Sequence, residues 1–308
     1  MPNVPSGELL TAEEAVVLAS SLSTWRTVDR RLVHKSALTE VLVTDLRSLS
    51  DDVVAVAAQW PRVHPVFQPT LDEDPDPVLF VETLRQAGIL LTHELLGVPL
   101  GHHFVFESIA ARYLRPGPRP RLDRDSVVLL GVGVSPRLRD GHVAGADLRI
   151  EAWSGSERFA VARASYRCLP PHVYARLRSL GARDAVPAAI PRPRAAEETT
   201  TALAVDLRHP TFFDHPADHL PGMLLIDAAL RAGRRAVRDG GEPWDFDLRF
   251  ERFAELGAPT SITTRPAGSG VEVVVSQPAG VVALGQVSGY ATVPAESRSA
   301  GPLPAGRS

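Results

Sequence analysis

An internal repeat constrains the fold of this chain more than any other feature of its sequence. When the chain is shifted by 145 residues, segment 64–88 aligns with segment 209–233 without a gap, and six of the 25 positions are identical. The identical pairs are His64/His209, Pro65/Pro210, Phe67/Phe212, Leu79/Leu224, Ala87/Ala232 and Gly88/Gly233. An acid coincides as well, since Glu82 falls on Asp227. The match predicts a duplication, with two copies of one structural unit in the chain.

Each copy predicts a buried helix that carries one acid. Residues 77–96 and the run after Pro221 are apolar on most faces, which is typical of a helix inside a domain. A buried carboxylate is costly unless it is paired. Asp227 has Arg231 four residues later on the same helical face. It is therefore either half of a structural ion pair or an acid at the end of an apolar pocket.

Short helices and strands are predicted around these two long helices. The short helices are expected at 11–21, where Thr11 and Glu14 can form a capping box, and at 171–180. The second long helix is expected to end near Gly240-Gly241. Strands are expected at 40–45, 53–59, 103–113, 126–134, 146–153, 159–168, 202–206, 246–253, 259–264, 271–276 and 281–287.

The order of strand, loop, long helix and further strands therefore occurs twice. We expect an N-terminal extension at 1–30, a first repeat at 31–180, a linker at 181–200, a second repeat at 201–293 and a disordered tail at 294–308. The linker and the tail are predicted from their composition, which is rich in Pro and Ala or in Pro, Gly and Ser.

Composition and charge exclude several classes of protein. The 308 residues are 44% apolar and 22% charged, and the formal net charge of −3 argues against a nucleic-acid-binding protein. The single Cys168 excludes an intrachain disulfide framework and favours a reducing compartment. No signal peptide or membrane span is expected. The sequence predicts a soluble, cytoplasmic protein.

Most of the other notable side chains favour structural interpretations. His64 and His209 precede proline in matching loops, which favours a hydrogen bond that fixes the turn. His215 and His219 lie in a DHxxDH pattern, but the prolines around them predict a loop rather than a metal-binding helix. His102 and His103 are expected to point to opposite faces of a strand. Cys168 is expected to be inert core.

The two long motifs resemble a known family. HPTFFDHPADHLPGMLLIDAALRA (209–232), together with QWPRVHPVF (59–67) and DPVLFVETLRQAGILLTHELLGVPLGHHFVF (76–106), is similar to the A-factor biosynthesis (AfsA-like) family over roughly residues 30–295. The resemblance implies an α+β double hotdog, in which each repeat is a long central helix wrapped by an antiparallel β-sheet. The two repeats would pack as a pseudo-dimer, and copies of the chain could associate further.

The resemblance also implies an activity. Enzymes of this family transfer a β-ketoacyl group from acyl carrier protein to the hydroxyl of dihydroxyacetone phosphate, and the ester cyclises towards a γ-butyrolactone-type bacterial signalling molecule. No cofactor and no metal is expected. Glu82, Arg85 and Gln86 match the family's E-x-x-R-Q motif in the first repeat. In the second repeat, Asp227, Leu230 and Arg231 stand where the family has Glu, Arg and Gln.

A mechanism can be proposed for the candidate residues. Glu82 and Asp227 are the candidate catalytic acids, and burial among aliphatic side chains is expected to raise the pKa of Glu82 and make it a general base. Amides of the helix that begins at Gly222 could hold the carbonyl oxygen or a phosphate. The candidate substrate-binding side chains are Arg62, Arg85, Gln86, His215, His219 and Arg231.

Two other functions stay open from the sequence. A hotdog protein can hydrolyse or dehydrate an acyl thioester without a phosphorylated acceptor. The altered second motif is also compatible with a protein that binds an acyl chain or lactone without catalysis. If catalysis occurs, it can take a different acceptor or depend mainly on the repeat that contains Glu82.

Overall fold

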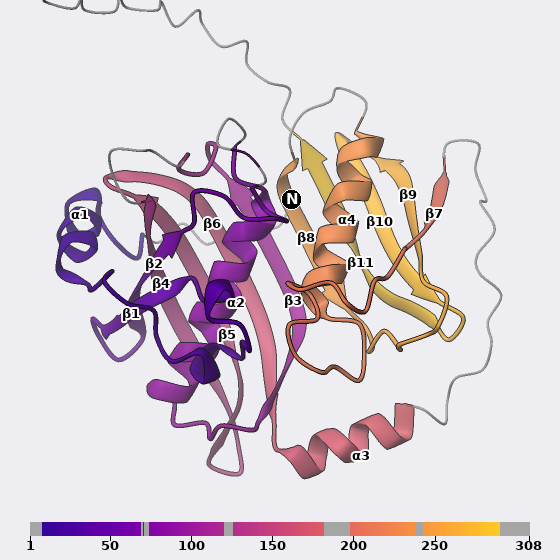
Figure 1. Ribbon diagram of the computed structural model, residues 1–308, viewed down its shortest axis with the longest axis horizontal. Coiled ribbons are helices and arrows are strands. Elements are labelled where there is room, and N and C mark those ends of the chain that lie inside the picture. The colour runs from indigo at the N-terminus through magenta and orange to yellow at the C-terminus, as the bar shows by residue number, and fades with distance from the viewer. Residues whose placement is uncertain are drawn as a thin grey trace, which may run out of the picture.

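The computed structural model describes residues 8–68, 70, 74–119, 126–181, 198–237 and 243–289. Within these residues, eleven strands form one antiparallel sheet that curves around two helices (Figure 1). One half of the sheet wraps α2 (Pro77–Glu94) and the other half wraps α4 (Gly222–Ala236). A helix wrapped by an antiparallel sheet is a hotdog unit, so the predicted double-hotdog fold is confirmed.

The two halves of the sheet join edge to edge. The spatial order of the strands is β1-β2-β4-β5-β6-β3-β8-β11-β10-β9-β7. The first six strands are β1 (Val43–Ser48), β2 (Val53–Trp60), β3 (His103–Tyr113), β4 (Ser126–Arg139), β5 (His142–Ser154) and β6 (Glu157–Leu169). The other five are β7 (Thr199–Ala202), β8 (Pro243–Phe250), β9 (Ser261–Ala267), β10 (Gly270–Gln277) and β11 (Gly280–Gly289). Because β3 pairs with β8, the two repeats share one continuous sheet.

Two further helices lie outside the two wrapped ones. α1 (Ala12–Ser21) packs its buried Ala15 and Leu18 on the sheet, and the predicted capping box between Thr11 and Glu14 is confirmed. α3 (Pro171–Gly181) follows β6 and lies below the second half in Figure 1. Two 3-10 turns, η1 (Arg30–Val33) and η2 (Leu38–Glu40), precede β1. Among the described helices, none combines the length and apolar composition that crossing a membrane requires.

α2 begins and stays buried for local reasons. The carboxylate of Asp76 accepts a hydrogen bond from the amide of Val78, and Pro77 occupies the first turn, where its missing N–H has no cost. Along the helix, Glu82, Gln86 and His93 are buried together with the aliphatic side chains. Polar groups at such positions require partners, which the site described below supplies.

The repeated histidines fix two matching turns, as predicted. The Nδ1 atom of His64 accepts hydrogen bonds from the amides of Val66 and Phe67, at 3.3 and 3.2 Å. In the second repeat, Nδ1 of His209 accepts from the amides at 211 and 212, both at 3.3 Å. Each ring also packs on the phenylalanine three residues later. Both histidines therefore have a structural role in the turn that precedes the repeat's helix.

The repeated glycines bring each helix close to the sheet. A Cβ atom added at Gly88 would lie 3.1 Å from Cδ1 of Leu148 on β5. A Cβ atom at Gly233 would lie 2.7 Å from Cβ of Val287 on β11. The missing side chain therefore allows the close approach in both repeats, which explains why glycine occurs at this position twice.

Several predicted boundaries were wrong by a few residues, among them the end of the strand expected at 126–134, which continues to Arg139 as β4. The strand expected at 40–45 begins at Val43, because Glu40 belongs to η2. The strand expected at 202–206 is β7, which ends at Ala202 as the chain approaches a turn fixed by the bond from the Arg208 amide to Asp206. α4 ends at Ala236, where Val237 turns to extended backbone, and β8 ends at Phe250. The predicted tail and nearly all of the predicted linker lie outside the described residues.

The close approach at Gly233 generates a test. Alanine in a helix normally stabilises relative to glycine, but Gly233→Ala is expected to lower the free energy of unfolding by about 1–3 kcal/mol through overpacking. Chemical denaturation of the variant measures the change. Gly233→Ala combined with Val287→Ala should be more stable than the sum of the two single changes predicts. Additive effects would contradict the proposed contact.

Candidate active site

A cavity of about 220 Å³ lies between the two repeats. One part of its wall is polar and is formed by His34, Lys35, Glu82, Arg85, Asp214 and His215. Another part is apolar or aromatic and is formed by Leu84, Gly88, Ile89, Phe104, Phe106, Leu148, Ala164 and Tyr166. Because residues 211–223 of the second repeat complete the wall, neither repeat alone encloses this space. The predicted groove between the repeats is present.

Glu82 is the centre of the polar wall. Its carboxylate accepts two hydrogen bonds from Arg85, from Nε and Nη2 at 2.9 Å each. It also accepts one from Nε2 of Gln86 at 2.8 Å, and the ammonium of Lys35 lies 3.1 Å away. Two cations and an amide therefore surround one carboxylate that is only 3% exposed.

The predicted raised pKa of Glu82 is wrong. Burial acts to raise the pKa, as the prediction assumed, but Arg85 and Lys35 outweigh it. Together with the hydrogen bonds from Arg85 and Gln86, they hold the pKa of Glu82 far below its ordinary value. Glu82 is therefore a permanent anion that orients two cations, and it is poorly suited to be a general base.

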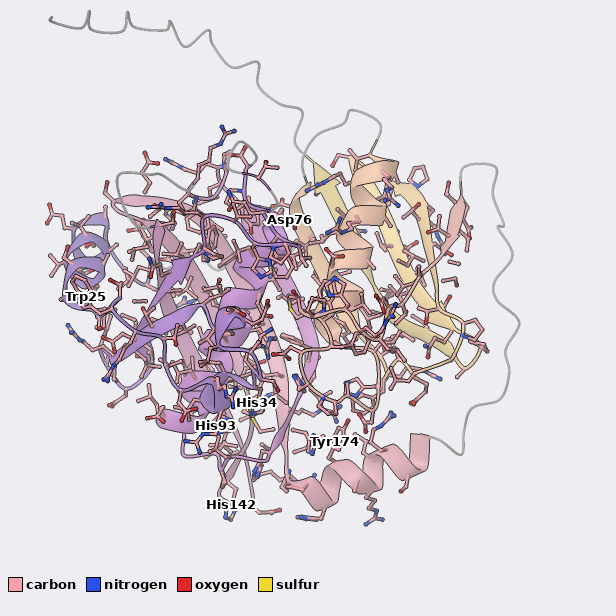
Figure 2. All side chains as sticks on the ribbon, in the orientation of Figure 1. Trp25, His34, Asp76, His93, His142 and Tyr174 are labelled. Carbon is pink, nitrogen blue, oxygen red and sulfur yellow. The ribbon has the colours of Figure 1, made fainter. Side chains whose placement is uncertain are left out.

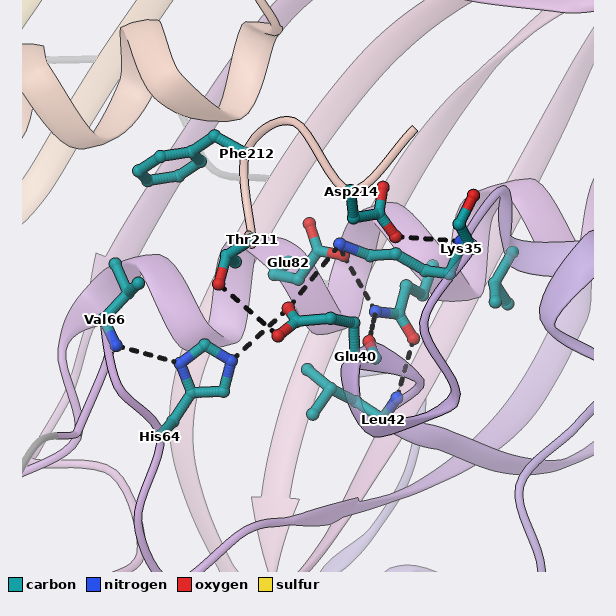
Figure 3. A network of polar contacts seen from close by, with 12 residues as sticks. Lys35, Glu40, Leu42, His64, Val66, Glu82, Thr211, Phe212 and Asp214 are labelled. Atoms are coloured by element: carbon teal, nitrogen blue, oxygen red, sulfur yellow. Dashed lines mark hydrogen bonds and ion pairs between the residues drawn. The ribbon is translucent and has the colours of Figure 1, made fainter. Parts of the chain in front are cut away.

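A second carboxylate extends this network towards the other repeat (Figure 3). Glu40 lies 3.9 Å from the ammonium of Lys35 and 3.5 Å from Nε2 of His64. The hydroxyl of Thr211, in the loop before α4, donates to Glu40 at 3.4 Å. Gln86 lies behind Glu82 and binds the backbone at Glu40 and Leu42, at 2.7 and 2.8 Å. Gln86 is thus a support for Glu82 rather than part of the cavity wall.

Arg85 presents a cation to the cavity. Besides its bond to Glu82, Nη2 of Arg85 donates to the carbonyl of Val33 at 3.3 Å. Nη1 of Arg85 makes no hydrogen bond within the described ranges. Its side chain is 15% exposed, and it lines the cavity. A guanidinium held on two sides by Glu82 and Val33 is oriented to bind an anion with its remaining edge.

His215 and His219 both line the cavity, each beside a carboxylate of its own loop. Nδ1 of His215 contacts the buried Asp214, whose other oxygen accepts from the amide of Ser36 at 2.9 Å. Nδ1 of His219 lies 2.6 Å from Asp218 and 3.2 Å from the hydroxyl of Tyr174 on α3. The second repeat therefore contributes two oriented imidazoles opposite Glu82.

The first turn of α4 faces the same space. Pro221, Gly222 and Met223 line the cavity. The carbonyl of Pro221 accepts hydrogen bonds from the amides of Leu224 and Leu225, at 3.0 and 3.3 Å. The amides of Gly222 and Met223 are among those that a helix does not bond internally. A side chain at 222 would approach Phe106, since an added Cβ atom would lie 3.2 Å from its ring.

Asp227 and Arg231 are not in the cavity. The predicted pair is present, with Nε of Arg231 2.8 Å from both oxygens of Asp227. With Asp76 and Arg234, these residues line a crevice that has no room for a water molecule. Burial raises the pKa of Asp227 more than Arg231 lowers it. The structural interpretation of this pair is therefore favoured over an acid in a pocket.

Arg62 is also separate from the cavity. It lines a different hollow on the first repeat together with Trp25 and Trp60. Among the nine residues predicted for the site, the cavity brings together Glu82, Arg85, His215, His219 and Gly222, with Gln86 behind them. Arg62, Asp227 and Arg231 lie elsewhere.

Several residues of the wall were not predicted. Lys35 is the only lysine of the chain, and this was the signal that could have drawn attention to it. His34 lines the cavity one residue earlier. His102 and His103 both line it as well, so the expectation that they face apart was wrong, because β3 begins only at His103. Cys168 is buried, which raises its pKa to about 12 and agrees with an inert thiol.

The described residues contain no group of three or more His, Cys, Asp or Glu side chains placed to hold a metal ion. The double hotdog itself occurs in solved structures of low sequence identity. A 12:0-ACP thioesterase from Umbellularia californica has a TM-score of 0.54 at 10% identity and covers 79% of this chain and 98% of its own. An acyl-ACP thioesterase from Bacteroides thetaiotaomicron has a TM-score of 0.50 at 11% identity, with 78% and 99% coverage. Fold and cavity thus define a protein of the double-hotdog class.

The family is shown by closer similarities. A protein-family model described as the A-factor biosynthesis hotdog domain matches residues 18–170 and 182–237 of this chain. A protein of Streptomyces virginiae is 32% identical over 264 residues, 78% of this chain and 87% of its own. A protein of Streptomyces coelicolor is 31% identical over 323 residues, which cover 90% of this chain and 98% of its own. Both are named 2-oxo-3-(phosphooxy)propyl 3-oxoalkanoate synthase. The chain belongs to the A-factor biosynthesis hotdog family.

The charge cluster generates a stability prediction. Glu82→Gln leaves Lys35 and Arg85 without their shared anion, so the free energy of unfolding is expected to fall by about 3–5 kcal/mol. Urea denaturation measures the change. Glu94→Gln is the matched control, because Glu94 is exposed at the end of the same helix, and it should change stability by no more than about 0.5 kcal/mol.

The same cluster predicts a dependence on pH. A carboxylate whose pKa is lowered by folding stabilises the protein above its unfolded pKa, and this contribution is lost as the pH falls towards the folded pKa. The stability difference between wild type and Glu82→Gln should therefore be constant above the ordinary glutamate value of 4.5 and shrink below it. A difference that grows as the pH falls would contradict the assignment.

Proposed function

We propose that this chain is an acyltransferase of γ-butyrolactone-type signal biosynthesis. It joins a β-ketoacyl group, delivered on acyl carrier protein, to the hydroxyl of dihydroxyacetone phosphate. The name of the two relatives describes this product: an ester of a 3-oxoalkanoic acid with a phosphorylated 2-oxopropyl group. The chain spans nearly the whole length of both relatives, which supports the transfer of the complete activity.

The observation that carries the proposal is the division of the cavity into a cationic and an apolar wall. Arg85 and Lys35 are held on Glu82 at one side. Phe104, Leu148 and Ala164 form part of the other. A phosphorylated ester with an alkyl chain requires both surfaces, the first for its phosphate and the second for its tail.

The reaction adds the acceptor's hydroxyl oxygen to the thioester carbonyl and expels the carrier's thiol. Arg85 has the charge and the free edge to bind the phosphate of the acceptor. Negative charge that develops on the carbonyl oxygen can be stabilised by the amides of Gly222 and Met223 at the N-terminus of α4. His215 and His219 lie at the same cavity as binding residues. Glu82 keeps both cations in place.

The duplicated acids have different roles in this proposal. Glu82 supports the reaction, whereas Asp227 belongs to an ion pair outside the cavity. Asp227→Asn is therefore expected to leave kcat/KM of the folded enzyme unchanged and to change thermal stability little, because burial already disfavours the charged form of Asp227 and offsets the loss of its pairing with Arg231. Steady-state kinetics and thermal unfolding of the same preparation distinguish the two effects. A large loss of kcat in a stable variant would return Asp227 to the catalytic site.

The activity itself is tested with purified protein and mass spectrometry. A β-ketoacyl acyl carrier protein is incubated with and without dihydroxyacetone phosphate. A phosphorylated ester that forms only with the acceptor is the expected product. Free β-keto acid or an enoyl product in either reaction would instead identify a hydrolase or a dehydratase, and unchanged thioester that stays bound would identify a binding protein.

The phosphate assignment predicts a selective kinetic defect. Arg85→Lys retains the charge but loses the planar fork that contacts both Glu82 and the cavity. KM for dihydroxyacetone phosphate should rise by about tenfold or more, as expected when a charge-assisted hydrogen bond is lost, while KM for the acyl donor stays the same. An equal rise in both KM values would indicate a general disturbance of the cavity.

A further inference from the structure

The proposed reaction needs a group that accepts the hydroxyl proton, and Glu82 is not suited to this role. One of its oxygens is within 3.1 Å of Arg85, Gln86 and Lys35, and the other accepts from Nε of Arg85 at 2.9 Å. The proton acceptor must therefore be sought elsewhere on the cavity wall.

His93 has a tautomer that its surroundings determine. Nδ1 of this buried ring lies 2.7 Å from the carbonyl oxygen of Val98. A carbonyl oxygen can only accept, so Nδ1 must carry the proton. In the neutral ring, Nε2 is then an acceptor with its lone pair in the ring plane.

The tautomer of His93 determines that of His34. Nε2 of His93 lies 3.0 Å from Nε2 of His34, and the two residues are labelled next to each other in Figure 2. Because the His93 nitrogen accepts, the His34 nitrogen must donate, which leaves the lone pair of His34 on Nδ1. His34 lines the cavity, and its Nδ1 makes no hydrogen bond within the described part of the chain.

Packing and charge keep His34 in this state. The ring of Phe104 packs edge-on against both imidazoles, with centroid distances of 5.1 Å to His34 and 5.2 Å to His93. Burial lowers the pKa of His34 to about 3, and the charge of Arg85 acts in the same direction. The ring is therefore neutral at ordinary pH, and it lines the same cavity as the cation expected to bind the phosphate.

The backbone of His34 supports a role for its side chain. The residue lies in the left-handed region, with φ 53° and ψ 52°, and its amide bonds the carbonyls of Arg30 and Arg31 at the end of η1. Glycine adopts this conformation at no steric cost, whereas other residues are uncommon there. Histidine is one of the few other residues that are enriched in this conformation, so it is compatible with the turn, and the imidazole is what it adds over glycine.

We propose that His34 is the proton acceptor of the acyl transfer and that His93 is its positioning residue. The inference rests on the proposed function. As the hydroxyl oxygen of the acceptor bonds to the thioester carbon, its O–H bond breaks and the proton passes to Nδ1 of His34. The C–S bond then breaks, and the leaving sulfur takes the proton from Nδ1. The net change is an ester plus the free thiol of the carrier, with His34 neutral again.

Two features favour this proton transfer although His34 is a weak base when the cavity holds no substrate. Burial is the main cause of that low basicity, and a phosphate dianion bound at Arg85 offsets the positive charge that adds to it. As His34 gains a proton, its Nε2–H becomes a charge-assisted donor to His93, and that hydrogen bond strengthens. The chain of Val98 carbonyl, His93 and His34 thus orients the base in the way that a carboxylate orients the histidine of a catalytic triad.

The central experiment replaces His34 with glycine, which suits the left-handed backbone and leaves space for a small molecule. Ester formation by His34→Gly is expected to have a kcat at least about 100-fold lower, as for the loss of a general base. Added imidazole should restore the activity with saturation, and it should not rescue Glu82→Gln. His142→Gln, in which an exposed histidine is changed, should match wild type. If His34→Gly misfolds, His34→Asn tests the same loss, since asparagine also accepts this conformation.

The positioning role of His93 requires a separate readout. His93→Leu should lower kcat with little change in KM and allow His34 to take either tautomer, which ¹⁵N NMR of the imidazole nitrogens detects. His93→Gln should restore much of the activity, because its carbonyl oxygen can accept from Nε2 of His34. Equal kinetics for the leucine and glutamine variants, or an unchanged tautomer in the leucine variant, would contradict this role.

The outcomes separate this inference from the proposed function. A wild-type protein that makes no phosphorylated ester refutes the proposed function, and the assignment of His34 as base then fails with it. An active wild type with a fully active His34→Gly variant refutes only the inference. An inactive His34→Gly variant that imidazole does not rescue, although it is folded and binds both substrates, also refutes it.

Discussion

The buried anion of Glu82 is the interaction on which the rest of the site depends. Two cations from different parts of the chain, Lys35 before the first strand and Arg85 on α2, meet on one carboxylate. Without it, they would repel each other in a space with little water. With it, one face of each cation can be directed into the cavity. The cluster also explains why the apolar helix α2 carries a carboxylate. Glu82 balances the two positive charges that line this side of the cavity.

The second repeat uses the same helix position differently. The shorter Asp227 pairs with Arg231 one turn away and lines a narrow crevice outside the cavity. The second repeat instead contributes Asp214 and His215, from the loop before α4, to the cavity that Glu82 lines. One cavity is therefore built from the helix of the first repeat and the loop of the second, although each repeat contains both elements.

The sequence predicted the elements whose cause is local or repeated. Both long helices follow from apolar runs that begin after a proline, and the turns at His64 and His209 follow from their identical neighbours. The sequence could not show that Lys35 lies against Glu82, because the pattern around Lys35 is not periodic and the contact depends on the turn at His34. For this reason, the pKa of Glu82 was predicted in the wrong direction. The sequence indicated that Glu82 is buried and that Arg85 is near it, but it did not indicate the second cation, Lys35. For Asp227 the sequence left an ion pair and an acid in a pocket both open, since its similarity to Glu82 suggested a similar environment.

The continuous sheet through β3 and β8 has an evolutionary consequence. In a homodimer of single hotdog units, any substitution appears at both symmetry-related sites, so a residue cannot improve one site without altering the other. Covalent fusion removes this coupling. After duplication, the acid of the first repeat could keep its place at the shared cavity while that of the second took an ion pair outside it. A single asymmetric chain can therefore distinguish two dissimilar substrates, an acyl donor and a small polar acceptor, which a symmetric pair of sites would meet in identical surroundings.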